Sequence, residues 1–134
     1  MQKYMGLFVV AVWMAIVPAW AQTDKWTDDN CTNRAGNIYT INGVKFCRSN
    51  QKMNWWSAHS WCDKHGGTLI PFEHLCPATP FQVGEHCSNQ LGTDMWVNEA
   101  FVQSGQVRGC RTGYNGQQLY CSDMTRNSAT ALCE

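Results

Sequence analysis

Histidine and cysteine are the residue types whose spacing in this chain suggests chemistry. His59, Cys62 and His65 recur at three-residue intervals. Two further pairs lie downstream: His74 with Cys76, and His86 with Cys87. Zinc requires three or four ligands of these types, with the cysteine thiolates free to bind. The competing interpretation, which we favour, is that the cysteines form disulfides and the histidines lie at the surface or at helix ends. We therefore predict no metal site.

Serine, histidine and aspartate also lie close together in the same stretch. Ser57 or Ser60 would be the nucleophile, with His59 as the base and Asp63 as its partner. Adjacent positions on a helix do not face each other, so Ser60 cannot use His59 in this way. The chain also has no nucleophile-elbow motif and no paired-carboxylate site. We predict that the protein is not an enzyme and carries no cofactor.

The chain begins with a pattern typical of a signal peptide. After Lys3, residues 6–17 form an apolar run of about 12 residues. Such a run matches the core of a secretion signal and is shorter than the roughly 20 residues that span a bilayer. Small residues at Ala19 and Ala21 suit a signal peptidase. We predict a signal peptide at residues 1–21, cleaved after Ala21; the alternative is an uncleaved anchor.

The number of cysteines indicates an oxidising compartment. All eight lie after the signal, and an even count in that context predicts four disulfides. The expected location is therefore secreted, periplasmic or at the cell surface. The cysteines are Cys31, Cys47, Cys62, Cys76, Cys87, Cys110, Cys121 and Cys133.

The charge balance excludes two classes of partner. The chain has ten Lys and Arg residues and ten Asp and Glu residues, and removing Lys3 with the signal leaves nine against ten, a net charge near −1. Such a chain offers no basic footprint for nucleic acid or for an anionic membrane. We expect the partner to be an extracellular glycan or protein surface, with no membrane insertion after the signal is cleaved.

A helix at residues 55–65 positions many of these side chains. Asn54 or Ser57 is the expected N-cap, because either side chain can accept a hydrogen bond from an orphan backbone amide. Gly66 and Gly67 end the helix, since glycine adopts the left-handed C-cap conformation without a Cβ clash. One face of this helix carries Ala58, Trp61, Cys62 and His65.

The rest of the chain predicts one α+β domain with one or two helices and short antiparallel strands. Its clearest hairpin spans residues 37–46, because Asn42-Gly43 separates two β-forming runs. Residues 71–75 are a candidate second helix, and residues 76–87 form a loop. The other expected strands are a buried strand at 95–97 and its neighbour at 100–102, two strands at 107–110 and 117–121, and a closing strand at 129–133.

The helix and the chain end resemble a known family. The helix block matches a Trp-x-x-Ala-x-x-x-Cys-x-x-x-Gly-Gly-x-Leu pattern at Trp55, Ala58, Cys62, Gly66, Gly67 and Leu69. Shorter matches are Trp96-Val97 and the terminal Ala131-Leu132-Cys133-Glu134. This pattern is similar to that of the C-type lectin-like domain. The resemblance implies that residues 31–134 form such a domain, preceded by an N-terminal segment at residues 22–30.

The resemblance also implies a disulfide pairing. Eight cysteines alone allow on the order of a hundred pairings. The family pattern selects three of the bonds, and the fourth would be a local addition that closes the loop at residues 76–87. The implied bonds are Cys31–Cys47, Cys62–Cys133 and Cys110–Cys121 from the family, and Cys76–Cys87 as the addition.

The chain departs from the calcium-binding members of that family. Their Glu-Pro-Asn or Gln-Pro-Asp triplet and their Trp-Asn-Asp motif are absent, and no proline lies between residues 96 and 133. Only Glu99 and Asp123 supply carboxylates there before Glu134. Calcium requires six to eight oxygen ligands, and the loop that would supply them is short. We predict calcium-independent binding.

Ligand-binding candidates lie around this short loop and on one tryptophan. The candidates are Arg108, Arg111, Tyr114, Asn115 and Trp56. Trp56 adjoins another tryptophan, and two consecutive residues of a regular element cannot both point inward, so we expect Trp56 to be exposed. The alternative is that the aromatic residues pack in the core and the polar residues solvate a turn. Weaker candidates of the same kinds are Trp26, Gln117, Gln118 and Tyr120.

Two functions are consistent with these features. The first is a secreted or surface-exposed recognition module that binds a glycan or a protein without calcium. The second is a structural or surface-assembly component with no small ligand. Asn30-Cys31-Thr32 also fits a glycosylation acceptor, which matters only in a host that glycosylates.

Overall fold

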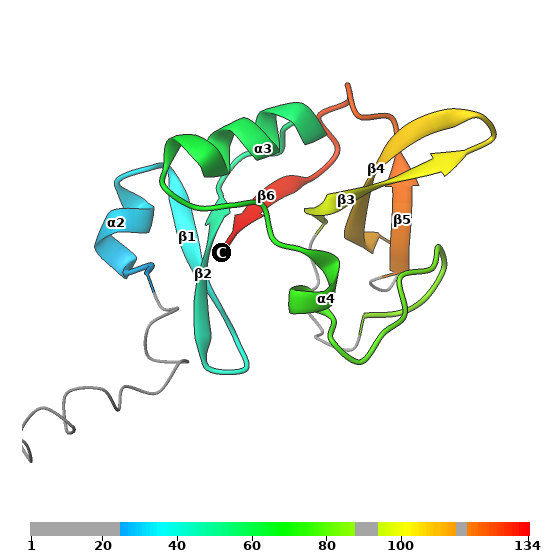
Figure 1. Ribbon diagram of the computed structural model, residues 1–134. Coiled ribbons are helices and arrows are strands. Elements are labelled where there is room, and N and C mark those ends of the chain that lie inside the picture. Colours follow the sequence, from blue (N-terminus) through cyan, green and yellow to red (C-terminus); the bar gives the residue numbers. More distant parts are fainter. Residues whose placement is uncertain (1–24, 88–93, 115–117) are drawn as a thin grey trace, which may run out of the picture.

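The computed structural model describes residues 25–87, 94–114 and 118–134. The predicted signal peptide at residues 1–21 lies outside these ranges. The described part is an α+β fold with three helices, a six-stranded mixed sheet and four disulfides (Figure 1).

The sheet has the strand order β1-β2-β6-β3-β4-β5. We expected antiparallel strands, but β6 pairs parallel to β3 and antiparallel to β2. The last strand therefore joins the two halves of the sheet. The strands are β1 (Gly36–Ile41), β2 (Val44–Ser49), β3 (Met95–Gln103), β4 (Gln106–Tyr114), β5 (Gln118–Ser122) and β6 (Thr130–Cys133).

Two tight turns connect antiparallel pairs. Asn42 and Gly43 both have positive φ between β1 and β2, as the hairpin prediction required. Ser104 and Gly105 do the same between β3 and β4. From the sequence we expected two strands, at residues 95–97 and 100–102, but the structure has one strand, β3, with a register shift between Trp96 and Ala100.

The described residues contain three helices, whereas we expected one or two. The additional helix, α2 (Asp28–Thr32), begins because Thr27 and Asn30 form a reciprocal capping box. The central helix, α3 (Trp55–Lys64), is capped by Asn54, whose side chain accepts from the Ser57 amide at 2.7 Å. The short helix α4 (Phe72–Leu75) follows at the expected place.

The sheet separates two buried clusters. Side chains along a strand alternate between its faces, so Trp96 belongs to the cluster under α3, while Met95 and Val97 belong to the other. Trp55 and Cys62 of α3 join the first cluster. The other cluster is completed by α4 through Phe72 and Leu75.

Four disulfides cross-link these elements, with the same pairing that the family resemblance implies. Cys62–Cys133 ties α3 to β6, and Cys31–Cys47 ties α2 to β2. Cys110–Cys121 joins β4 to β5, and Cys76–Cys87 closes the loop after α4. All eight cysteines are bonded, so no thiolate remains for a zinc site.

Candidate functional site

Arg111 is a structural residue in this fold rather than an exposed cation. Arg111 is only 8 % exposed, and its guanidinium forms an ion pair with the Asp94 carboxylate at 2.7 Å. It also donates to the Ser122 hydroxyl at 3.3 Å and lies 5.1 Å from the centre of the Tyr120 ring. These contacts tie β4 and β5 to the start of β3.

The structure separates Arg108 from Arg111 instead of bringing them together. The two residues are three positions apart on β4, so their side chains leave opposite faces of the sheet. Arg108 pairs across the hairpin with Phe101 and donates to the Gln106 side chain at 3.0 Å. The polar cluster that the sequence suggested is therefore divided between two faces.

The two remaining candidates at this loop are Tyr114 and Asn115. The backbone of Tyr114 ends β4 and pairs with Gln118. Asn115 and the side chain of Tyr114 lie outside the described part of the chain. They stay predictions.

Trp56 is exposed, as the sequence analysis expected. It is 59 % exposed, whereas Trp55 is buried. Trp55 packs directly over Gly109 of β4, where an added Cβ would lie 2.5 Å from the indole. The ring of Trp56 meets Trp55 edge-on at 5.0 Å, which places Trp56 at the border of the surface that α3 covers.

Beyond that border, the sheet presents an uncovered apolar surface. Val102 and Val107 are direct cross-strand partners, and they are 65 % and 60 % exposed. Alternation along β4 and β5 places Gly109 and Tyr120 on the same face as Val107. We call Val102 and Val107 the outer hairpin face; Tyr120 lies on the same side of the sheet, beyond the Gly109 position that Trp55 covers.

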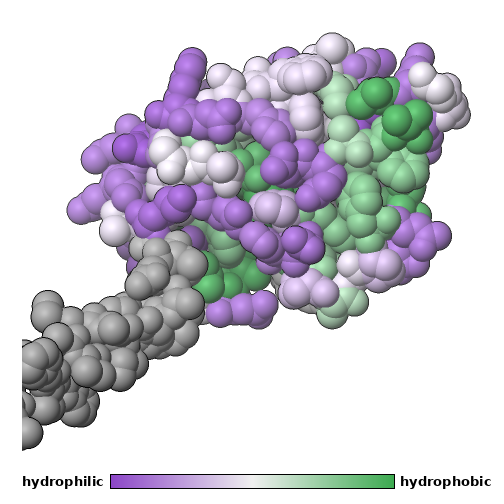
Figure 2. Space-filling model, viewed as in Figure 1, coloured by the Kyte–Doolittle hydropathy of each residue, from purple (hydrophilic) through white to green (hydrophobic). Residues whose placement is uncertain are grey.

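The space-filling view shows an asymmetry of the same kind on the face that it presents (Figure 2). Hydrophobic residues gather on the side that carries the β3–β4 hairpin, and hydrophilic residues gather on the side that carries α2 and β1 (Figure 2). Exposed apolar residues that form a contiguous patch mark interaction surfaces more often than isolated ones do. We did not predict this surface from the sequence, because we assigned residues 100–102 to the neighbour of a buried strand.

The opposite face of the same hairpin is anchored. The Phe101 ring meets Phe81 at 6.2 Å, and Phe81 meets the buried Phe72 at 5.4 Å, both in edge-on geometry. These aromatic contacts hold the hairpin against the loop that follows α4. The outer hairpin face is therefore presented on a fixed support.

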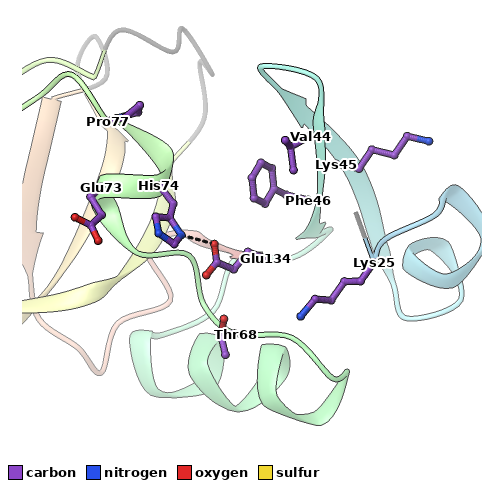
Figure 3. Close-up of a pocket in the computed structure, with 9 residues that line it drawn as sticks. All are labelled: Lys25, Val44, Lys45, Phe46, Thr68, Glu73, His74, Pro77 and Glu134. Carbon is purple, nitrogen blue, oxygen red and sulfur yellow. Dashed lines mark hydrogen bonds and ion pairs between the residues drawn. The ribbon is translucent and has the colours of Figure 1, made fainter. Parts of the chain in front are cut away.

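A second feature is a groove of about 620 Å³ between the β1–β2 hairpin and α4. Val44, Phe46 and Pro77 give it apolar walls. The side chains of His74 and Glu134 face it from the other side, joined by the interaction drawn in Figure 3.

The His74–Glu134 pair has a short contact of 2.6 Å between Nδ1 and the carboxylate. The hydrogen bond that the Glu134 carboxylate accepts from the His74 ring is the main cause that raises the pKa of His74 above its ordinary value of 6.5. Three carboxylates, those of Glu134, Glu73 and Glu99, add to this effect by charge. The α4 side of the groove therefore carries negative potential.

His59 has the opposite environment. Its ring lies 4.1 Å from Trp55, and burial lowers its pKa below 6.5. Among the described residues, no group of three or more His, Cys, Asp and Glu side chains is arranged to hold a metal ion. The sequence candidates His59, His65 and His74 serve separate local contacts.

The predicted glycosylation acceptor already has a structural role. The Asn30 side chain accepts from the Thr27 amide at 2.8 Å and donates to the Lys25 carbonyl at 3.1 Å. The next residue, Cys31, is buried in a disulfide. Asn30 thus belongs to the capping of α2.

Comparison with known proteins gave no match: no family model fits the sequence, and no curated protein or solved structure is significantly similar to it. Within the described ranges, no helix has the length and apolar character needed to cross a bilayer. Four disulfides are typical of proteins that fold in an oxidising, extracytoplasmic environment.

Proposed function

We propose that this protein is an exported recognition module that binds a protein surface, without calcium, through the outer hairpin face. The observation that carries the proposal is the pair of exposed valines, Val102 and Val107, directly opposite each other on a fixed hairpin. A soluble domain gains nothing in its own stability from apolar side chains held in water. A partner that covers them removes that apolar area from water.

The support behind this face is rigid. The Cys110–Cys121 disulfide joins the two strands that carry Val107 and Tyr120. The Trp55 indole donates to the Val97 carbonyl at 3.0 Å and so fixes α3 on the sheet beside the hairpin. A preorganised surface loses little conformational freedom on binding.

The chemistry of the face favours a protein over a sugar. Branched aliphatic side chains bury well against another protein, whereas sugar sites rely on aromatic stacking and hydrogen-bonding groups. A glycan is the second candidate because Trp56 and Tyr120 are both exposed aromatic residues, at 59 % and 41 %. An assembly role, in which copies of the chain pack through this face, is the third.

We further propose that the domain is C-type lectin-like. Trp55, Ala58 and Cys62 of the helix block face one buried cluster, and Gly66 has the positive φ that ends the helix. Cys62 is bonded to Cys133 on the last strand. These features support the resemblance that the sequence pattern suggests.

The hydrogen bonds of two carboxylates near the hairpin support the proposal that binding does not require calcium. Glu99 accepts the Phe72 amide at 2.8 Å, and Asp123 accepts the amide and the hydroxyl of Thr125. Each carboxylate thus serves its own local hydrogen bonds. Calcium needs several carboxylates that converge on one point.

A peptide-display selection against the disulfide-bonded protein, carried out in a chelator, tests this function. We expect apolar peptides whose binding is lost in a Val102→Ser/Val107→Ser variant. The matched control is Gln103→Ser/Gln106→Ser, the next cross-strand pair, whose side chains leave the other face. This control should bind as the wild type does.

Other outcomes would favour a different function or a different binding site. Selective binding on a glycan array that Trp56→Ala abolishes would favour the sugar. A mass that rises with protein concentration, and falls in the valine variant, would favour assembly. Equal peptide binding by the valine variant and the wild type would contradict the outer hairpin face as the site.

A further inference from the structure

The groove beside α4 has walls of opposite charge. Figure 3 shows the carboxylate of Glu134 and the ring of His74 on one side, with Glu73 on the same wall further out. On the other side, Lys25 turns its ammonium end toward Thr68 at the floor, while Lys45 points away from the groove. Lys25 therefore supplies the cation of one wall. Glu134 supplies the anion of the other, where its Oε2 is paired with His74 and its Oε1 takes no part in that contact.

An apolar surface lies between these charges. The ring of Phe46 projects from β2 toward His74, with Val44 beside it (Figure 3). A mainly apolar pocket with a few convergent polar groups and a histidine of perturbed pKa is the usual form of a ligand site. The volume of about 620 Å³ falls within the range of such sites.

We propose that this groove binds a short zwitterionic peptide with an apolar side chain. The peptide ammonium lies at Glu134, its carboxylate lies at Lys25, and its apolar side chain packs on Phe46 and Val44. The Thr68 hydroxyl, which faces the groove in Figure 3, is placed for the peptide backbone. This site is separate from the outer hairpin face and does not depend on it.

The placement of the two charges on opposite walls favours a peptide over a free amino acid. Lys25 reaches the groove from one side and Glu134 from the other (Figure 3). A free amino acid carries both charges on one carbon, too close together to reach opposite walls. Each extended residue adds about 3.3–3.6 Å, so two or three residues separate the charges enough.

Nuclear magnetic resonance titration of the disulfide-bonded protein tests this inference. The probe is the tripeptide Ala-Leu-Ala, and the expected response is a saturable shift of the amides of Phe46, Thr68 and His74. N-acetyl-Ala-Leu-Ala-amide, which lacks both charges, should bind about tenfold more weakly or worse, since charge-assisted hydrogen bonds are lost. Ala-Gly-Ala should also bind more weakly, because it lacks the apolar side chain.

Two variants locate the site. Lys25→Gln should weaken tripeptide binding about tenfold. Lys64→Gln, an exposed lysine at the end of α3, should leave it unchanged. Unchanged amide shifts outside the groove would show that both variants fold.

Four results would overturn the inference. They are no binding at about 10 mM peptide, equal binding of the blocked peptide, equal binding of free leucine, and equal binding by Lys25→Gln. Groove shifts that change with protein concentration in the absence of peptide would assign the groove to a second copy of the chain instead.

Discussion

Burial and charge oppose each other at Asp94. Burial raises the pKa of this carboxyl above its ordinary value, and this effect exceeds the opposing attraction of Arg111 and Lys52. One oxygen of Asp94 has no hydrogen-bond partner among the described residues, while the other is held by Arg111. The ion pair with Arg111 therefore offsets part of the free-energy cost of burying the Asp94 carboxylate. That cost remains when Arg111 is replaced.

We predict that Arg111→Met destabilises the fold by about 3–5 kcal/mol, because it leaves a buried carboxylate unpaired. Adding Asp94→Asn should recover most of that loss. Urea unfolding of the two variants measures both values. A loss below about 1 kcal/mol for Arg111→Met would show that Arg111 is not structural and would return it to the ligand-binding candidates.

The pKa values of His74 and His59 are shifted in opposite directions from the ordinary value for histidine. The Glu134 hydrogen bond raises the pKa of His74, and burial lowers the pKa of His59. The stabilisation from His74 is therefore complete below about pH 6.5 and is lost as the pH rises through its higher folded-state pKa. The stability at His59 changes with the opposite sign, falling as the solution becomes more acidic than about pH 6.5.

Glu134→Gln tests this assignment. Ring-proton titration should place His74 above 6.5 and His59 below it in the wild type, and the variant should bring His74 down while leaving His59 unchanged. The stability difference between wild type and variant should be larger at pH 6 than at pH 9. A His74 pKa that is the same in the Glu134→Gln variant as in the wild type would contradict the His74–Glu134 contact in the groove wall.

Among the helices and strands, α3 was predicted well, because the residues that begin and end it are close neighbours in the sequence. Its start depends on the Asn54 cap and its end on Gly66, and both act within one turn of the chain. The hairpin turn at Asn42-Gly43 is local in the same sense. The capping box that begins α2 was also present in the sequence, at Thr27 and Asn30, but the polar composition around it concealed a helix of only five residues.

The candidate site depended on contacts that no local pattern contains. Period-two alternation on β4 was sufficient to separate Arg108 from Arg111 once the strand was assigned. The burial of Arg111 depends on Asp94, which lies 17 residues earlier in the chain. The exposure of Val102 depends on where α3 stops covering the sheet. Neither fact has a signal in the neighbouring sequence.

The disulfides should contribute unequally. Cys62–Cys133 spans 71 residues, whereas Cys76–Cys87 spans 11. In the chain-entropy model these loops correspond to about 4–5 and about 3 kcal/mol of stabilisation. Removing each pair as a double alanine variant and measuring urea unfolding should show the larger loss for Cys62–Cys133. Equal losses would indicate that the unfolded chain is already constrained by the remaining bonds.

At the scale of the whole molecule, the two proposed sites divide the surface. The outer hairpin face lies on the β3–β4 hairpin, beyond the cover of α3, and the groove lies between the β1–β2 hairpin and α4. The sheet and the disulfides hold both sites in a fixed relation through β6, which joins the two halves. Variants at one site should therefore leave binding at the other unchanged.

The most direct test of the central claim is the affinity of the outer hairpin face for a selected apolar peptide whose two ends are blocked, since the groove should bind such a peptide poorly. Isothermal titration should be run with wild type and with Val102→Ser/Val107→Ser, each in millimolar calcium and in chelator. We predict one affinity for the wild type in both buffers and at least about a tenfold loss in the variant. A wild-type affinity that requires calcium, or a variant that binds as tightly as the wild type, would contradict the account.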